Sequence, residues 1–571
     1  MYNSFWSLSV VSLLLSVRAV IAQNDTEILP ILQSIVDCDT CHAALIPLKA
    51  LARTGDDKFS NAFVEACDEA QVDDPDVCRG LFTRLGPIIA KDLRSISTKK
   101  QTASRLCDAL FGFCMSKIPN AFAVPLPRPA KPHASPHSEQ PTPSPARAKP
   151  FQVIQISDVH IDRDYTVGSE ANCTKNICCR NFTDEIGKPI TEPAKRFGNS
   201  KCDSPTSLAD SMLDAVNAIN AKFVIFTGDV VAHDDWLTTR EEVTFDLEDF
   251  NAEMLSRIKA KVFPSFGNHD STPVNAFPRN TTETTMDIQW AYGRRLGGKY
   301  SSTFPRSILV YVYLTLPTQI KALDRKDCKS ASGSYFRELC SCSARYKPDY
   351  WYKQNDDFHG HFSGRPDPNG ILAFMVEQLQ TAETAGKKVW IIGHIPLGKA
   401  DTVVDQSNYY DQILQRYKTT IVGQFFGHSH KDQFEIAYSN YSQQTAANAV
   451  GVGLICPALT PTSGNPAFKV YDVDPDTLGI MNIRVIFANL TDPTFQKNPT
   501  WKLYYDTRQV YGPLVRLPSN SELTPAFWHN LTEEFARNET AFQLFNTFIS
   551  RGEMSLRVTI RTVAGTLRFV T

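Results

Sequence analysis

The chain has 571 residues, of which 42% are hydrophobic and 21% are charged, so it can form two or three domains with a sizeable core. Its formal net charge of −2 lacks the basic excess by which nucleic-acid-binding proteins hold phosphate backbones. These values favour a soluble enzyme or binding protein, and we expect no nucleic-acid partner.

The chain opens with an apolar stretch, MYNSFWSLSVVSLLLSVRAVIAQ, that ends in small residues. It is short for a membrane span and typical of a secretory signal peptide over residues 1–22, cleaved near Ala22. Eight N-x-S/T sequons follow as candidate glycosylation sites: Asn24, Asn172, Asn181, Asn280, Asn440, Asn489, Asn530 and Asn538. We therefore expect a secreted or lysosome/vacuole-like location. In such an oxidising compartment, we interpret the 14 cysteines as disulfide-forming in preference to metal-binding.

Residues 34–118 hold six cysteines between helix-forming patterns such as CHAALIPLKALA and KFSNAFVEACDEA. Taken alone, Cys38-x-x-Cys41 could be half of a zinc site or a redox pair, although no second CxxC matches it. Six cysteines also allow many disulfide pairings, and the spacing does not choose among them.

This six-cysteine helical pattern resembles a saposin B-type domain, an all-α disulfide-bonded module that binds lipids. A leaflet of amphipathic helices buries little apolar surface alone, so disulfides hold it together and lipid covers its open face. The alternative is a disulfide-stapled bundle without a lipid role. The resemblance implies nested pairs: Cys38 with Cys114, Cys41 with Cys107, and Cys67 with Cys78.

Residues 119–150 are dense in Pro, Ser and Ala. This composition predicts a semi-extended linker and a domain boundary. His133 and His137 lie within it, and we expect both to be solvated.

From residue 151 onward, short apolar segments alternate with helical patterns, which predicts an α/β layered fold. Five apolar segments end in polar residues, at the carboxyl ends of strands where such folds place their sites. A single strand-end Asp is most often a helix cap or turn former, but five such motifs in series point to a site. The polar residues are Asp158, His160, Asp229, Asn268, His269, His394, His428 and His430.

The set contains His, Asp and Asn but no Cys, and these ligand types suit zinc or another first-row divalent ion. The order D-x-H, G-D, G-N-H-D, G-H, G-H-x-H resembles the calcineurin-like metallophosphoesterases. That resemblance implies a four-layer sandwich of two β-sheets flanked by helices over residues 151–470. A partly helical C-terminal region, 471–571, would pack on it.

The same resemblance implies two zinc ions bridged by Asp229. One would also be held by Asp158, His160 and His430, and the other by Asn268, His394 and His428. Water activated by the metals would attack phosphorus. His269 would protonate the leaving alkoxide, and His233 is a second catalytic candidate. For His233, the alternative is a supporting hydrogen bond to Asp229 or to phosphate.

The saposin-like region, the linker and segments such as GDVVAHD and QFFGHSHKDQFEI together resemble the acid sphingomyelinase family. The resemblance implies hydrolysis of sphingomyelin to ceramide and phosphocholine at acidic pH. We expect a monomer whose saposin-like domain touches membranes or lipoproteins that contain sphingomyelin or a related phospholipid. One alternative is a phosphodiesterase or phosphatase of nucleotides or other phospholipids, and another is a lipid-binding or transfer protein with an inactive metal site.

Two segments depart from that family, residues 307–349 and the tail after 553, and either is an insertion or a gene-model artefact. The family's local pairing implies disulfides Cys173–Cys178 and Cys179–Cys202. The pairing of four cysteines stays open: Cys328, Cys340, Cys342 and Cys456.

Overall fold

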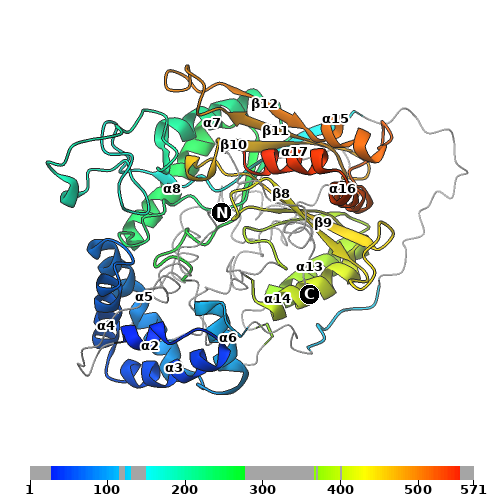
Figure 1. The fold of residues 1–571 in the computed structure, drawn as a ribbon. Coiled ribbons are helices and arrows are strands. Elements are labelled where there is room, and N and C mark those ends of the chain that lie inside the picture. Colours follow the sequence, from blue (N-terminus) through cyan, green and yellow to red (C-terminus); the bar gives the residue numbers. More distant parts are fainter. Residues whose placement is uncertain are drawn as a thin grey trace, which may run out of the picture.

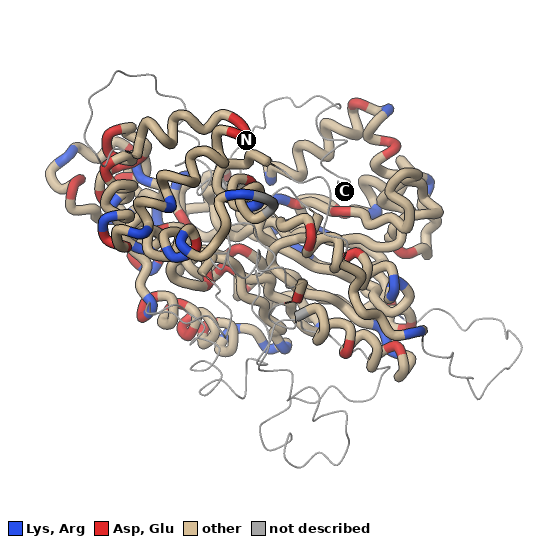
Figure 2. The backbone as a smooth tube through the Cα atoms, turned by 90° about the horizontal axis from the view of Figure 1, so that it is seen from below, with Lys and Arg blue, Asp and Glu red and all other residues tan. Residues whose placement is uncertain are grey.

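The computed structural model describes residues 28–114, 122–129, 149–276, 366–367, 371–398 and 402–552. Several predictions lie outside these residues: the signal peptide, Asn24, Asn280, His133, His137, residues 307–349 with Cys328, Cys340 and Cys342, and the tail after 552. Figure 2 shows basic and acidic residues interspersed along the described chain.

The amino-terminal region is all-helical (blue in Figure 1). Its helices are α2 (Leu29–Gln33), α3 (Cys38–Ala52), α4 (Asp56–Glu69), α5 (Pro75–Ser95) and α6 (Lys100–Phe111). Helix α3 begins at a capping box, in which the Asp37 side chain accepts from the Thr40 N–H and the Thr40 side chain bonds back to Asp37. Disulfides join Cys38 to Cys114, Cys41 to Cys107 and Cys67 to Cys78, the nested pairs that we expected. The region therefore has the helical, disulfide-bonded form of a saposin-like domain.

Two β-sheets follow. One has six strands in the order β12-β11-β10-β1-β4-β5. Its strands are β1 (Phe151–Ile156), β4 (Phe223–Phe226), β5 (Lys261–Pro264), β10 (Ala467–Val473), β11 (Ile480–Ala488) and β12 (Trp501–Asp506). The other has four strands, in the order β6-β7-β9-β8: β6 (Val389–Ile392), β7 (Ile421–Phe426), β8 (Gln433–Tyr438) and β9 (Ala449–Ile455). A short pair, β2 (Ile161–Asp162) and β3 (Ser204–Pro205), stands apart.

The sheets stack because alternate residues of each strand face opposite sides. In β1, Val153 joins a core shared with Trp390 and Phe425 of the second sheet. Its neighbour Ile154 packs with Leu208 on the opposite face. Helices α7 (Thr206–Ala218) and α8 (Arg240–Arg257) cover the first sheet, and α13 (Ile371–Thr384) and α14 (Val404–Tyr417) cover the second (Figure 1). The chain thus has the expected four-layer sandwich of two β-sheets flanked by helices.

The carboxyl-terminal part belongs to the same sandwich. The boundary that we expected at residue 470 falls inside β10, and β11 and β12 extend the sheet beyond it, so the sandwich continues at least to Asp506. Composition gives no break at this point because all three strands have the same apolar texture. Helices α15 (Thr507–Tyr511), α16 (Pro525–Arg537) and α17 (Glu539–Ile549) then pack on the core between the sheets.

The start of the predicted linker is partly docked. Val124 is buried against the α13–α14 layer, and its N–H donates to Gln412 Oε1 at 2.9 Å. Arg416 Nε donates to the Pro127 carbonyl at 2.8 Å. Residues 122–129 therefore lie along α14 instead of standing free in solvent, a contact that composition alone does not reveal.

The helical region and the sandwich share a packed interface. Trp236 lies within the core of the helical region, and a Cβ at Gly80 would come within 2.8 Å of the Trp236 Cβ. Lys175 Nζ, fully buried, pairs with Asp74 at 3.1 Å and with Asp76 at 2.6 Å. Among the described helices, none has the length and apolarity needed to cross a membrane.

Loop 163–202 of the sandwich is stapled by disulfides Cys173–Cys178 and Cys179–Cys202, the expected pairs. Cys456, whose pairing the sequence left open, is a buried free thiol. Asn172, Asn181, Asn440 and Asn530 are exposed, and Asn489 and Asn538 are half-buried. Glycosylation at these positions stays a prediction.

Candidate metal centre

Five loops meet where parallel strands end. Strands β1, β4 and β5 run parallel in one sheet, and β6 and β7 run parallel in the other. Their carboxyl ends therefore face one region, as expected for an α/β active site. The seven expected ligands lie in the loops that follow these strands, and the structure brings their polar atoms together: Asp158, His160, Asp229, Asn268, His394, His428 and His430.

One group of ligand atoms comes from Asp158, His160, Asp229 and His430. His160 Nε2 lies 3.1 Å from His430 Nε2 and 3.5 Å from Asp229 Oδ2. His430 Nε2 lies 3.5 Å from Asp158 Oδ1. These atoms all lie within 4.8 Å of one another, close enough for one ion to reach each of them.

The second group comes from Asp229, His394 and His428, with Asn268 between them. Asn268 Oδ1 lies 3.1 Å from His394 Nε2 and 3.0 Å from His428 Nδ1. His394 Nε2 lies 3.0 Å from Asp229 Oδ2, the same oxygen that faces His160 in the first group. One carboxylate oxygen is thus shared by two sets of ligands.

The backbone at these positions is unusual. Five of the seven residues have positive φ, a region that side chains other than glycine rarely adopt and that carries a cost. They are Asp158 (49°), His160 (37°), Asp229 (61°), His428 (70°) and His430 (58°). Such strain clusters at functional sites because the surrounding structure imposes it.

Hydrogen bonds fix the histidine rings. His160 Nδ1 lies 2.7 Å from the Val231 carbonyl, and His394 Nδ1 lies 2.6 Å from the Thr227 carbonyl. Each Nδ1 therefore carries the proton, and Nε2 keeps a lone pair for a ligand. Burial, followed by the charge of His233, lowers the pKa of both His160 and His430, so these rings are neutral, as a metal ligand must be.

The residues fit divalent metal ions. Within the described chain, Asp158 Oδ2 is buried without a hydrogen-bond partner, which is costly unless a cation or water satisfies it. The donor set of imidazole, carboxylate and amide oxygen suits zinc and similar first-row ions.

Asp270 ties two of the ligand loops together. It accepts the N–H groups of Asp229 at 3.0 Å, Val230 at 2.7 Å and Gly267 at 2.7 Å. Its role was not expected from sequence, because the motif G-N-H-D identified it only as the fourth letter.

Two further histidines lie beside the ligands. The His233 ring stacks on His160 with centroids 3.8 Å apart, and the His269 ring lies 4.7 Å from that of His233. His269 Nδ1 lies 3.1 Å from Asp235 Oδ1. Burial lowers the pKa of His269, but Asp235 and Asp229 outweigh it and raise the pKa to about 9. The Asp235 carboxylate on Nδ1 thus favours the protonated ring, the form that can give up a proton.

His233 has its own carboxylate partner, Asp203, at 2.8 Å from Nδ1. A ring nitrogen of His233 also lies near those of His160 and His430. The His233 side chain is 19% exposed, however, whereas that of His160 is fully buried. His233 and His269, the two histidines at the rim of the metal site, were predicted from the sequence, but their carboxylate partners Asp203 and Asp235 were not. Asp203 stands 30 residues from His233, and no spacing pattern joins them.

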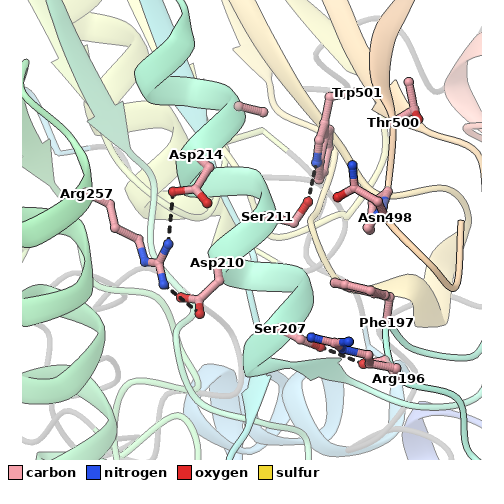
Figure 3. A pocket seen from close by; sticks show the side chains of 12 residues that line it. Arg196, Phe197, Ser207, Asp210, Ser211, Asp214, Arg257, Asn498, Thr500 and Trp501 are labelled. Carbon is pink, nitrogen blue, oxygen red and sulfur yellow. Dashed lines mark hydrogen bonds and ion pairs between the residues drawn. The ribbon is translucent and has the colours of Figure 1, made fainter.

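A cavity of about 570 Å³ lies elsewhere, between α7 and residues 498–501 (Figure 3). Arg257 within it already pairs with Asp210 at 2.8 Å and Asp214 at 2.9 Å, and Trp501 donates to Ser211. None of the seven expected ligands lines this cavity. The chemistry therefore belongs at the strand ends.

Residues 151–432 match the calcineurin-like phosphoesterase family. The chain is 30% identical to the sphingomyelin phosphodiesterase of Bos taurus over 421 residues, which cover 69% of this chain and 59% of that protein. It is 30% identical to the Homo sapiens sphingomyelin phosphodiesterase, over 70% of this chain and 59% of that protein. Sphingomyelin phosphodiesterase 1 of Caenorhabditis elegans is 25% identical over 83% of this chain and 80% of that protein.

The chain thus spans about three fifths of the length of the bovine and human relatives. Among solved structures, one titled "Structure of PhoD" aligns with a TM-score of 0.35 and 9% identity, covering 64% of this chain and 70% of that chain. This likeness is too weak for a comparison of sites.

Proposed function

Since residues 151–432 form a calcineurin-like phosphoesterase domain in a chain similar to sphingomyelin phosphodiesterases, we propose that this protein is a zinc-dependent sphingomyelin phosphodiesterase. It hydrolyses sphingomyelin to ceramide and phosphocholine in an acidic secreted or lysosome-like compartment. The observation that carries the proposal is the Asp229 oxygen shared by two sets of ligands, 3.5 Å from His160 and 3.0 Å from His394.

Two bound ions would supply a water of lowered pKa and stabilise charge on the phosphoryl oxygens. Asp158, His160 and His430 would hold one, and Asn268, His394 and His428 the other, with Asp229 between them. Their loops are fixed by the carbonyls of Val231 and Thr227 and by Asp270. The protein thus holds the ligands in place before substrate arrives. Such preorganised electrostatic stabilisation of the transition state is usually the largest single contribution to catalysis.

His269 is the proposed general acid. The Asp229 Oδ1 accepts its backbone N–H at 2.8 Å, so the residue is fixed beside the shared ligand. Asp235 occupies Nδ1, so Nε2 is the nitrogen that can donate a proton to the departing ceramide oxygen. His233 Nδ1 is held by Asp203, and its ring lies beside the ligands His160 and His430, where it would contact the phosphoryl group of a bound substrate.

The saposin-like region presents lipid to this site. Val36 is 63% exposed and Ile46 is 56% exposed, although both belong to an otherwise packed helical unit. In a lipid-binding module of this kind, these two side chains would be the apolar groups available to contact a lipid surface. Trp236 of the sandwich is buried in the core of the helical region, so removing residues up to 150 would expose it to solvent. Point substitutions therefore test the lipid-contacting role better than truncation does.

Val36→Ser with Ile46→Ser is therefore expected to reduce hydrolysis of sphingomyelin in vesicles and to leave hydrolysis of a soluble phosphocholine diester unchanged. Val167→Ser, at a loop residue that is 60% exposed, is the matched control. Equal losses on both substrates would mean that the helical region has a structural role only.

The activity itself is tested with a substrate panel. Sphingomyelin, other phospholipids, nucleotide diesters and phosphomonoesters are compared at about pH 5 and pH 7, before and after chelation and zinc addition. We expect sphingomyelin to be preferred at the lower pH and zinc to restore activity. Preference for a nucleotide would assign the same metal chemistry to a different substrate.

A further inference from the structure

Most of the hydrogen bonds that the Asp203 carboxylate accepts come from His233. Asp203 is fully buried, and its two oxygens accept the His233 backbone N–H at 2.7 Å and the ring Nδ1–H at 2.8 and 3.0 Å. The remaining donor is the Thr460 hydroxyl, at 3.0 Å from Asp203 Oδ1. The orientation of the His233 ring therefore depends on a carboxylate that Thr460 helps to hold.

Thr460 belongs to a loop, residues 458–465, that lies against the backbone of the ligands Asp158 and His430. The N–H groups of Leu459 and Thr460 donate to the Asp158 carbonyl at 3.2 and 3.3 Å. The Thr460 side chain is fully buried, so its hydroxyl cannot exchange Asp203 for water. The loop thus makes two kinds of contact. Its backbone hydrogen-bonds to the ligand Asp158, and the Thr460 side chain hydrogen-bonds to Asp203, the partner of His233.

The other side of this loop is held by Arg551, which follows α17. Its guanidinium is buried and donates to the carbonyls of Ala458 at 2.6 Å, Asn465 at 3.0 Å and Thr460 at 3.4 Å. Asn465 Nδ2 donates back to the Arg551 carbonyl at 2.7 Å. All three contacts converge on Nη1, and Nη2 also lies 3.5 Å from the Thr460 carbonyl. A lysine ammonium ends one bond closer to the backbone than Nη1, so it cannot reach the same position.

The approach of the two segments is close. A Cβ at Gly464 would lie 2.8 Å from the Ser550 carbonyl oxygen and 3.3 Å from the Arg551 Cβ, and Gly464 has a φ of 120°. Only glycine fits this conformation and this spacing. The loop and the end of α17 are therefore built to lie against each other.

We propose that Arg551 and Thr460 are positioning residues for His233: Arg551 holds loop 458–465, and the Thr460 hydroxyl fixes Asp203, which fixes the His233 ring. The inference rests on the proposed function, because it concerns how a rim histidine meets the phosphodiester. Loss of either contact leaves the metal ligands in place but lets the His233 ring rotate away from its reactive orientation.

The test is a pair of double-mutant cycles. Thr460→Val and Arg551→Lys are made alone and in a His233→Ala background, with Thr244→Val in α8 and Arg416→Lys in α14 as controls for a lost hydroxyl and a lost guanidinium. Turnover of sphingomyelin in detergent micelles, metal content and melting temperature are measured for each. Substituting the hydrogen-bond partners that orient metal ligands typically costs about 10- to 100-fold in activity, and we expect each single variant to lose turnover on the same scale.

We expect both single variants to keep their metals and lose turnover, and neither to reduce it further once His233 is alanine, because coupled residues are not additive. The control variants should stay near wild-type turnover. Further losses in the His233→Ala background, or loss of metal, would overturn the proposal, because the loop would then act through Asp158.

Failure of the proposed function is a separate result, seen when wild-type protein with bound metal hydrolyses no phosphodiester. In that case crystal structures of wild-type and Thr460→Val protein decide the positioning question. A His233 ring that rotates away from Asp203 supports the inference, and a ring that stays in place overturns it.

Discussion

Gly267→Ala is expected to dislodge the ligand shared by the two metal positions. A Cβ at residue 267 would lie 2.6 Å from both the Cγ and the backbone nitrogen of Asp229. Heavy atoms in contact prefer about 3.5–4.0 Å, so the Asp229 carboxylate must move by about 1 Å. The same Cβ would press on the Asp229 backbone nitrogen, so the backbone that Asp270 holds must shift together with the carboxylate.

The magnitude follows from this shift. A misplacement of about 1 Å in a catalytic group can cost about 10²-fold in turnover, and overpacking a core position costs about 1–3 kcal/mol in stability. Gly267→Ala protein should therefore fold, with metal occupancy lowered at both positions and turnover reduced by about two orders of magnitude.

The assay is metal content by mass spectrometry, turnover of a soluble diester and melting temperature. Gly453→Ala in β9 is the matched control, since its nearest neighbour is the movable Phe426 ring at 3.2 Å. If Gly267→Ala protein retains two metals and wild-type turnover, Asp229 is not the bridging ligand.

Two further predictions concern proton transfer and pH. His269→Ala should keep its metals and lose about 10²–10⁴-fold on an alkoxide leaving group but far less on a nitrophenyl leaving group. Equal losses on both would make His233 the better general acid. Burial raises the pKa of Asp73 to about 6, above the unfolded value of about 3.9, so the folded protein binds a proton that the unfolded chain has released. Its contribution to stability is present below about pH 4 and is lost as the pH rises through about 6, so Asp73→Asn should raise the melting temperature more at pH 7 than at pH 5. An equal shift at both values would contradict the raised pKa.

The sequence predicted the features that local chemistry determines. Apolar segments that end in Asp158 or His428 predicted both the strands and the position of the site, because strand ends of parallel sheets converge. The layered fold followed from the same alternation of strands and helices.

The features that the sequence missed depend on contacts between distant segments. Arg551 and Thr460 are 91 residues apart, and an arginine after a helix has no pattern that distinguishes it from a surface residue. Val124 lies in a proline-rich stretch, yet it is buried against α14. The boundary at residue 470 was wrong because β10 continues the sheet without a change in composition.

The most direct test of the two-metal phosphodiesterase is product analysis with purified full-length protein. Protein stripped of metal by a chelator is incubated with sphingomyelin vesicles at about pH 5, with and without two equivalents of zinc. Ceramide and phosphocholine are then quantified. We predict that both products appear in equal amounts only after zinc is restored, and that Asp229→Asn protein fails to recover. Metal-loaded protein that binds the vesicles without releasing either product would contradict the assignment and identify the chain as a lipid-binding protein with an inactive site.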